Sequence, residues 1–236
     1  MALDKLLREF ESLFRGVVFR HRISTNGDKV AGYLYDDLFD LNRSPKLVSG
    51  IAAHRLVLNK KNRTTGRTAR RGDGTFGERV PAVPPQLRPG LAVALGDVAT
   101  IEIGTEAKIL AKAMIKQIDR VCTDMRNQAD EFRRHNPNAI CVGLVGINHA
   151  ASYTGYEGTR LWPTDGKKYV HPSQEAAEAE VRIQQNVAPR YDETIVLRFI
   201  AENTPPFNFA WVDSAKTAAE YSAALVRISR ECERRF

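Results

Sequence analysis

The sequence predicts an α/β protein with a central mixed sheet flanked by helices, and three observations support this. The nearly continuous apolar run at 139–147 is typical of a strand that is buried on both faces. Residues 105–134 carry apolar side chains at three- and four-residue steps, which is typical of a long amphipathic helix. Shorter helix and strand patterns alternate around these two segments, and such alternation favours a sheet covered by helices.

The N-terminal segment predicts one helix followed by a hairpin. Residues 4–14 place their apolar side chains on one helical face. Residues 17–23 alternate loosely between apolar and polar side chains and predict a strand. The polar turn at 25–28 would close this strand, with 30–35 as its hairpin partner.

Residues 36–90 are irregular and basic, and they predict an insertion or lobe on the α/β core. The segment 43–79 holds ten Lys or Arg and two acids, so its net charge of +8 exceeds the +7 of the whole chain. Residues 63–77 show no periodicity and predict a flexible loop. A clustered positive charge attracts polyanions through counterion release, although a merely solvated loop is the alternative. The side chains expected to contact nucleic acid are Lys60, Lys61, Arg63, Arg67, Arg70 and Arg71.

The rest of the chain completes one domain, 1–236, without internal repeats. Four further strands are predicted at 91–95, 98–103, 194–201 and 207–212, with a helix at 173–187. Thr217 and Glu220 have the spacing of a capping box and predict the start of the last helix.

Composition narrows the class of protein. A hydrophobic fraction of 43% and a charged fraction of 27% are ordinary for a soluble globular protein. No apolar run approaches the ~20 residues that cross a bilayer, so we expect no membrane partner. Nothing resembles a secretory signal, and Cys122, Cys141 and Cys232 lack the spacing of a disulfide framework or a zinc site. A reduced, cytoplasmic compartment fits this pattern best.

The segment 97–108 contains the strongest chemical signal. Asp97 precedes an apolar, β-branched run, Glu102 interrupts that run, and Glu106 and Lys108 follow it. An unpaired charge is expensive to bury, whereas carboxylates at a strand end are suited to a hard divalent cation such as Mg²⁺.

Acids on adjacent strands, followed by a long helix and a buried strand, resemble the PD-(D/E)XK nuclease superfamily, the fold of restriction endonucleases. The resemblance covers mainly 91–147, which becomes the candidate catalytic core. It implies that Asp97 is the first metal ligand, although Gly96 replaces the preceding proline. Two registers fit the second half of the motif. In one, Glu102 lies in the strand and Gly104 replaces the lysine.

The other register is the complete triplet Glu106-Ala107-Lys108, which periodicity assigns to the first turn of the long helix. We favour a combination in which Asp97 and Glu102 bind the metal ion and Lys108 reaches back from the helix. Each residue also has a purely structural interpretation. Asp97 would be a turn residue, Glu102 a solvent-facing strand residue, Glu106 a partner of the helix dipole and Lys108 a solvated charge.

The resemblance implies a Mg²⁺-dependent DNA endonuclease of the restriction type, which hydrolyses phosphodiester bonds. A restriction-type enzyme would act as a homodimer, so that two centres meet a palindromic site. The alternative is a non-catalytic nucleic-acid-binding protein on a decayed nuclease fold, with Gly104 as the mark of the lost lysine.

Overall fold

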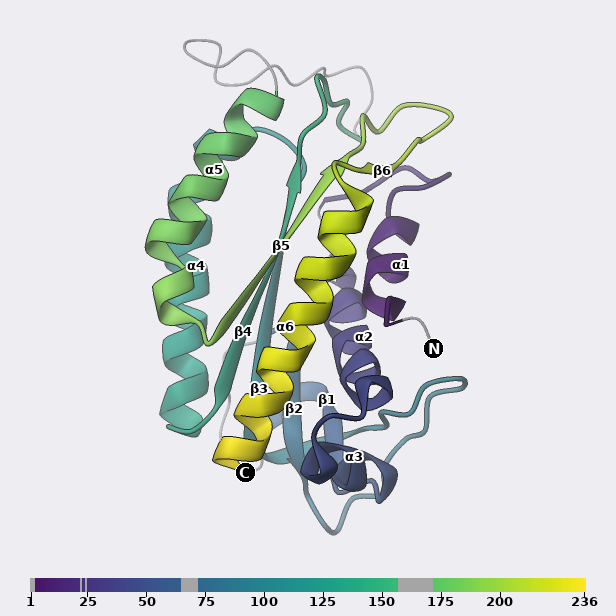
Figure 1. Ribbon diagram of the computed structural model, residues 1–236, viewed down its shortest axis with the longest axis vertical. Coiled ribbons are helices and arrows are strands. Elements are labelled where there is room, and N and C mark those ends of the chain that lie inside the picture. The colour runs from purple at the N-terminus through teal and green to yellow at the C-terminus, as the bar shows by residue number, and fades with distance from the viewer. Residues whose placement is uncertain (1–2, 22, 24, 65–71, 157–171) are drawn as a thin grey trace.

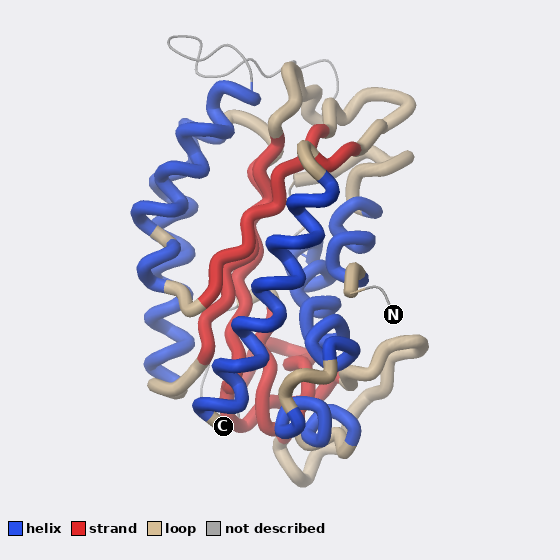
Figure 2. Tube along the Cα trace, viewed as in Figure 1, coloured by secondary structure: helices blue, strands red, loops and turns tan. Residues whose placement is uncertain are grey.

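A computed structural model describes residues 3–21, 23, 25–64, 72–156 and 172–236. This part confirms the α/β class, with helices on both sides of one mixed sheet (Figures 1 and 2). Its helices are α1 (Lys5–Ser12), α2 (Thr25–Leu41), α3 (Pro45–Ala52), α4 (Met114–His135), α5 (Pro172–Asn186) and α6 (Ser214–Arg235). Its strands are β1 (Leu56–Thr64), β2 (Gly74–Arg79), β3 (Leu95–Leu110), β4 (Ile140–Asn148), β5 (Glu193–Ile200) and β6 (Ala210–Trp211).

The sheet follows the order β1-β2-β3-β4-β5-β6 and is organised around β3. β3 pairs antiparallel with β2 and parallel with β4, which in turn pairs parallel with β5. All nine residues of β4 are buried, as the continuous apolar run predicted. Helices α4 and α5 cover one face of the sheet, and α1, α2 and α6 cover the other (Figure 1).

The predicted N-terminal helix is confirmed as α1, but the predicted hairpin after it is wrong. Residues 25–41 form the helix α2. Its buried face carries Val30, Leu34 and Leu38 at four-residue steps, the spacing of an amphipathic helix. A short window over 30–35 does not reveal this period, and the two acids at 36 and 37 interrupt the apolar pattern.

Those two acids are fully buried and hold α2 in place. The Asp36 carboxylate accepts hydrogen bonds from Arg88 Nη2 at 2.7 Å and from the backbone N–H groups of Ala92 and Val93. The Asp37 carboxylate accepts from the first two N–H groups of α1 and from the Tyr221 hydroxyl at 2.7 Å. Asp37 therefore ties α1 and α6 to α2, because helix N-termini have N–H groups without intrahelical partners.

The predicted boundary between strand and long helix is also wrong. Two strands at 91–95 and 98–103 were expected, with a helix from 105, but β3 continues without interruption to Leu110. The helix α4 begins only at Met114, after Ala113 adopts a left-handed backbone with φ 46°. Ala, Lys and Leu favour helix when read by propensity alone, and pairing with β4 on one side overrides that preference.

The C-terminal predictions are closer to the structure. α5 and β5 match the predicted helix and strand, whereas β6 has only two residues. The last helix begins at Ser214, where the Asp213 carboxylate accepts from the Lys216 N–H at 2.9 Å. Thr217 lies one turn inside this helix, so the predicted capping box is wrong.

The segment 36–90 contributes α3, β1 and β2, and both strands belong to the same sheet as β3. Residues 65–71 of the predicted flexible loop lie outside the described part of the chain. Within the described ranges, no helix is long and apolar enough to cross a membrane.

Candidate active site

The Glu106-Ala107-Lys108 triplet lies on β3, in its eight-residue parallel pairing with β4. The prediction that this triplet begins a helix is therefore wrong. In a strand, residues two apart point to the same face, so Glu106 and Lys108 lie side by side. Lys108 Nζ is 2.5 Å from Glu106 Oε1. Glu106 is only 5% exposed, and its second oxygen, Oε2, has no hydrogen-bond partner among the described residues.

Asp73 approaches the triplet from the residue before the neighbouring strand, β2. It directly precedes β2, and its Oδ2 accepts a hydrogen bond from the Ala107 N–H at 2.9 Å. The first turn of α2 also packs against this carboxylate. A Cβ added to Gly27 would lie 2.6 Å from Asp73 Cγ, so only glycine allows this approach. The positive end of the α2 dipole then faces the Asp73 carboxylate.

Glu106, Asp73 and Lys108 shift one another's protonation equilibria. Burial raises the pKa of Glu106, the Asp73 carboxylate raises it further, and Lys108 opposes both. Burial alone would lower the pKa of Lys108, but Glu106 and Asp73 outweigh it, so the pKa of Lys108 is raised and its ammonium stays charged. Asp124 of α4 acts in the same direction on both groups.

A cavity of about 310 Å³ opens beside these residues. Asp73 and Lys108 line it together with the first turn of α2, the end of β3 and the α4 residues Gln117, Arg120 and Asp124. The segment before α2 closes another side with Phe19, His21 and Ile23. Arg120 is exposed, so the rim adds a cation to a pocket with an acidic wall.

These residues suit a hard divalent cation. Mg²⁺ typically uses one or two protein carboxylates and takes its remaining ligands from water and substrate phosphate. Asp73 and Glu106 provide two carboxylates, and the unpartnered Glu106 Oε2 is a buried acceptor that a cation would satisfy. No group of three or more His, Cys, Asp or Glu side chains with metal-binding geometry occurs in the described ranges. The fit is therefore to a two-carboxylate site.

The structure does not bring together the predicted ligands Asp97 and Glu102. Both lie on β3, five residues apart, and a strand rises about 3.3 Å per residue, so about 16 Å separates their positions. Glu102 lies where the β2–β3 register shifts, and its side chain lines a different cavity, with Arg55, Glu78 and Cys232. Burial and Glu78 raise the pKa of Glu102 to about 7.

Gly104 has a packing role that explains the absence of a side chain there. A Cβ at this position would lie 2.4 Å from two ring atoms of Phe132, a buried residue of α4. The same ring blocks a Cβ at Gly72, at 2.5 Å from Cζ. Phe132 is thus wedged between β3 and the residue before Asp73, where no lysine side chain could fit.

The predicted nucleic-acid contacts fall largely beyond what the structure describes. Lys60, Lys61 and Arg63 lie on β1, but their side chains are outside the described part, and Arg67, Arg70 and Arg71 are wholly outside it. In sequence, the last of these six residues, Arg71, lies two residues before Asp73.

No protein-family model matches this chain, and no match was found among curated proteins or solved structures. The interpretation of the site therefore rests on its own geometry. Sequence reasoning missed Asp73 as a site residue and read it only as an acid within a basic loop. The available signal was an acid directly before the strand that precedes the Glu-x-Lys triplet, and the irregular loop before it obscured that strand.

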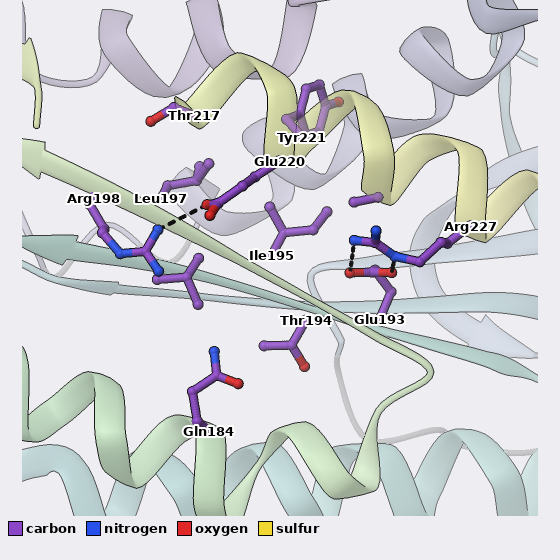
Figure 3. Close-up of a pocket in the computed structure, with 12 residues that line it drawn as sticks. Gln184, Glu193, Thr194, Ile195, Leu197, Arg198, Thr217, Glu220, Tyr221 and Arg227 are labelled. Atoms are coloured by element: carbon purple, nitrogen blue, oxygen red, sulfur yellow. Dashed lines mark hydrogen bonds and ion pairs between the residues drawn. The ribbon is translucent and has the colours of Figure 1, made fainter. Parts of the chain in front are cut away.

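A second cavity, of about 220 Å³, lies along the edge of β5 and is shown in Figure 3. Gln184 of α5 points toward it from one side, and α6 covers the other. Two ion pairs connect β5 with α6 here. Arg198 Nη1 lies 3.0 Å from Glu220, and Arg227 Nε lies 2.6 Å from Glu193. Charged side chains along a strand edge discourage pairing with another chain, so we assign this cavity a structural role.

Proposed function

We propose that this protein is a Mg²⁺-dependent endonuclease that hydrolyses phosphodiester bonds in DNA, with Asp73, Glu106 and Lys108 at its centre. The observation that carries the proposal is the buried Glu106 carboxylate. One of its oxygens pairs with Lys108, and the other has no partner among the described residues. The Asp73 carboxylate accepts a hydrogen bond from the backbone N–H of Ala107, the residue next to Glu106. Such a charge arrangement is costly for folding and is typical of a functional site.

The arrangement also fits the PD-(D/E)XK pattern better than the predicted residues do. The first acid directly precedes β2, and β2 is paired with β3, the strand that carries the Glu-x-Lys triplet. We therefore assign the first acid to Asp73 in place of Asp97, and the lysine to Lys108.

Each residue then has a defined role. Asp73 and Glu106 would hold the ion, and Mg²⁺ would supply Lewis-acid polarisation of the phosphate and a bound water of lowered pKa. Lys108 keeps its ammonium charged beside Glu106, where it can stabilise negative charge that develops on the phosphate oxygens. Arg120 and the N-terminus of α2 offer further positive charge on the cavity wall. Hydrolysis adds water across one P–O bond and leaves a phosphate and a hydroxyl end.

The proposal is tested by nicking of supercoiled plasmid with Mg²⁺, comparing wild type with Asp73→Asn, Lys108→Met and Asp97→Asn. We expect the first two variants to lose at least 100-fold in rate, since electrostatic groups at a reaction centre typically contribute that much. Asp97→Asn is the matched control and should cut at the wild-type rate.

Two results would count against the proposal. Equal nicking by wild type and Asp73→Asn would show a contaminant or a different centre. Salt-sensitive DNA binding without cleavage under any divalent cation would instead favour the alternative, a non-catalytic nucleic-acid-binding protein.

A further inference from the structure

The outer face of α4 carries two exposed cations, Lys116 and Arg120. They lie four residues apart in the helix, so their side chains are neighbours on its surface. Arg120 also lines the cavity that contains Asp73 and Lys108. The two cations therefore continue the positive charge of Lys108 from the cavity onto the surface of α4.

Neither cation is neutralised by the protein itself. Within the described ranges, the side chains of Lys116 and Arg120 form no ion pair and no hydrogen bond with another residue. The acid between them, Asp119, pairs instead with Arg182 of α5, whose Nη1 lies 3.0 Å from Asp119 Oδ1. Both cations are thus available to an anion from outside the protein.

The positions of these cations do not favour the helix. Lys116 lies in the first turn of α4, which contains no acid, and the positive end of the helix dipole repels a cation there. Like charges four residues apart also destabilise a helix. Local rules of this kind are typically broken at functional sites. A bound anion would relieve both repulsions.

A third exposed cation, Arg20, lies on another side of the cavity. Its neighbours Phe19 and His21 line the cavity, and its backbone C=O accepts a hydrogen bond at 3.3 Å from Asn26, which also lines it. A single small anion could not contact cations on two sides of the cavity. A phosphodiester backbone carries one negative charge per nucleotide, so it can contact both sides at once.

Resting on the proposed function, we propose that Lys116 and Arg120 form a contact surface for the phosphodiester backbone of the DNA substrate, next to Lys108 in the cavity. The sequence placed the DNA contacts within 60–71, whereas this surface lies on α4. Contacts to phosphates carry no sequence information directly. The surface should therefore contribute equally to the binding of different DNA sequences.

Fluorescence anisotropy of a labelled DNA duplex in EDTA measures this contact without cleavage. Wild type and the double variant Lys116→Gln/Arg120→Gln are compared between about 50 and 200 mM salt. We expect the double variant to bind at least about tenfold more weakly at the low-salt end. The slope of log K against log salt concentration should fall in magnitude by about 2, because each phosphate contact contributes about 0.9.

The matched control is Lys216→Gln/Arg230→Gln. It removes the same charge from exposed positions of α6, which covers the other face of the sheet (Figure 1). This control should bind DNA as wild type does. Equally weak binding by the control and the double variant would show an effect of net charge alone and would overturn the inference, as would an unchanged affinity or salt slope in the double variant.

Thermal unfolding separates this role from a structural one. Because the two cations repel each other and Lys116 is repelled by the helix N-terminus, the melting temperature of Lys116→Gln/Arg120→Gln should equal or exceed that of wild type. A lower melting temperature would show that these side chains stabilise α4 and would contradict the inference.

The outcome is separable from that of the proposed function. Plasmid nicking that depends on Asp73, together with unchanged DNA binding by Lys116→Gln/Arg120→Gln, would refute the contact surface alone. Weakened binding by this double variant, without Mg²⁺-dependent cleavage by wild type, would refute only the nuclease.

Discussion

A methyl group added at Gly104 should destabilise the protein, because the Phe132 ring occupies the space that it would need. The nearest ring atoms of Phe132 would lie 2.4 Å, 2.4 Å and 2.6 Å from a new Cβ, whereas ordinary contact is about 3.5–4.0 Å. The ring would therefore have to move by about 1 Å. It cannot retreat toward Gly72, whose own backbone it already approaches closely.

The expected cost follows from overpacking. Inserting a methyl group into a packed core costs about 1–3 kcal/mol, and alanine returns about 0.4–1 kcal/mol by restricting the unfolded chain. A net destabilisation of about 1–2 kcal/mol should lower the melting temperature of a domain of this size by about 2–8 °C. Because Phe132 supports Gly72, the displacement should also reach Asp73 and reduce Mg²⁺-dependent nicking.

Differential scanning calorimetry of Gly104→Ala and Gly143→Ala measures this effect. Gly143 is the matched control on the adjacent strand β4, because its Cβ would meet only the mobile end of Met125 at 3.2 Å and Tyr191 at 3.3 Å. We expect a clearly lower melting temperature for Gly104→Ala than for Gly143→Ala. A Gly104→Ala protein as stable as wild type would contradict the claim that close packing of Phe132 requires glycine at this position.

Three other substitutions have defined expectations. Asp37→Ala removes the acceptor of three hydrogen bonds, two of them buried, and should lower the free energy of unfolding in urea by about 3 kcal/mol. Asp40→Ala, which loses the salt bridge to Lys5, should lower it by about 1 kcal/mol or less, and equal costs would contradict this. Because the folded-state pKa of Glu102 is raised from 4.5 to about 7, the native state retains a proton that the unfolded chain loses over this window, so native stability falls as pH rises through it. The free energy of unfolding of Glu102→Gln should therefore equal that of wild type at pH 4 and exceed it by about 1–2 kcal/mol at pH 8, after allowance for solvent screening. A difference that does not change with pH would contradict this expectation. Arg198→Ala removes the ion pairs of Arg198 with Glu180 and Glu220, which place charge along the edge of β5. This variant should self-associate more than wild type in light scattering at high concentration, because charge at a strand edge discourages pairing with another chain. Arg182→Ala, on α5, should self-associate as wild type does.

The parts of the fold that the sequence predicted are those with an unambiguous hydrophobic period. β4 is buried on both faces, and α6 buries Tyr221, Leu225 and Ile228 at helical spacing, so each pattern has one solution. α2 was misassigned because its pattern includes the buried acids Asp36 and Asp37. Their partners come from α1, α6 and the segment before β3, and no local window contains those partners.

The candidate site was predicted only in part, because the sequence singled out the Glu-x-Lys triplet but not Asp73. The Glu-x-Lys triplet was recognised, yet a helical period extended backward from α4 placed it in the wrong element. Asp73 could not be assigned by spacing, because it lies 33 residues before Glu106 in the sequence and reaches Ala107 only through the pairing of β2 with β3. The contact between Asp73 and Ala107 therefore depends on how the sheet is assembled, which the local sequence does not specify.

The most direct test of the central claim is isothermal titration of the protein with Mn²⁺, a spectroscopically and calorimetrically convenient substitute for Mg²⁺, in the absence of DNA. We expect binding to the wild-type protein and to Asp97→Asn, and its loss in Asp73→Asn and Glu106→Gln. If Asp73→Asn and Glu106→Gln bind the ion as wild type does, the two carboxylates do not form a metal site and the proposed nuclease centre is contradicted.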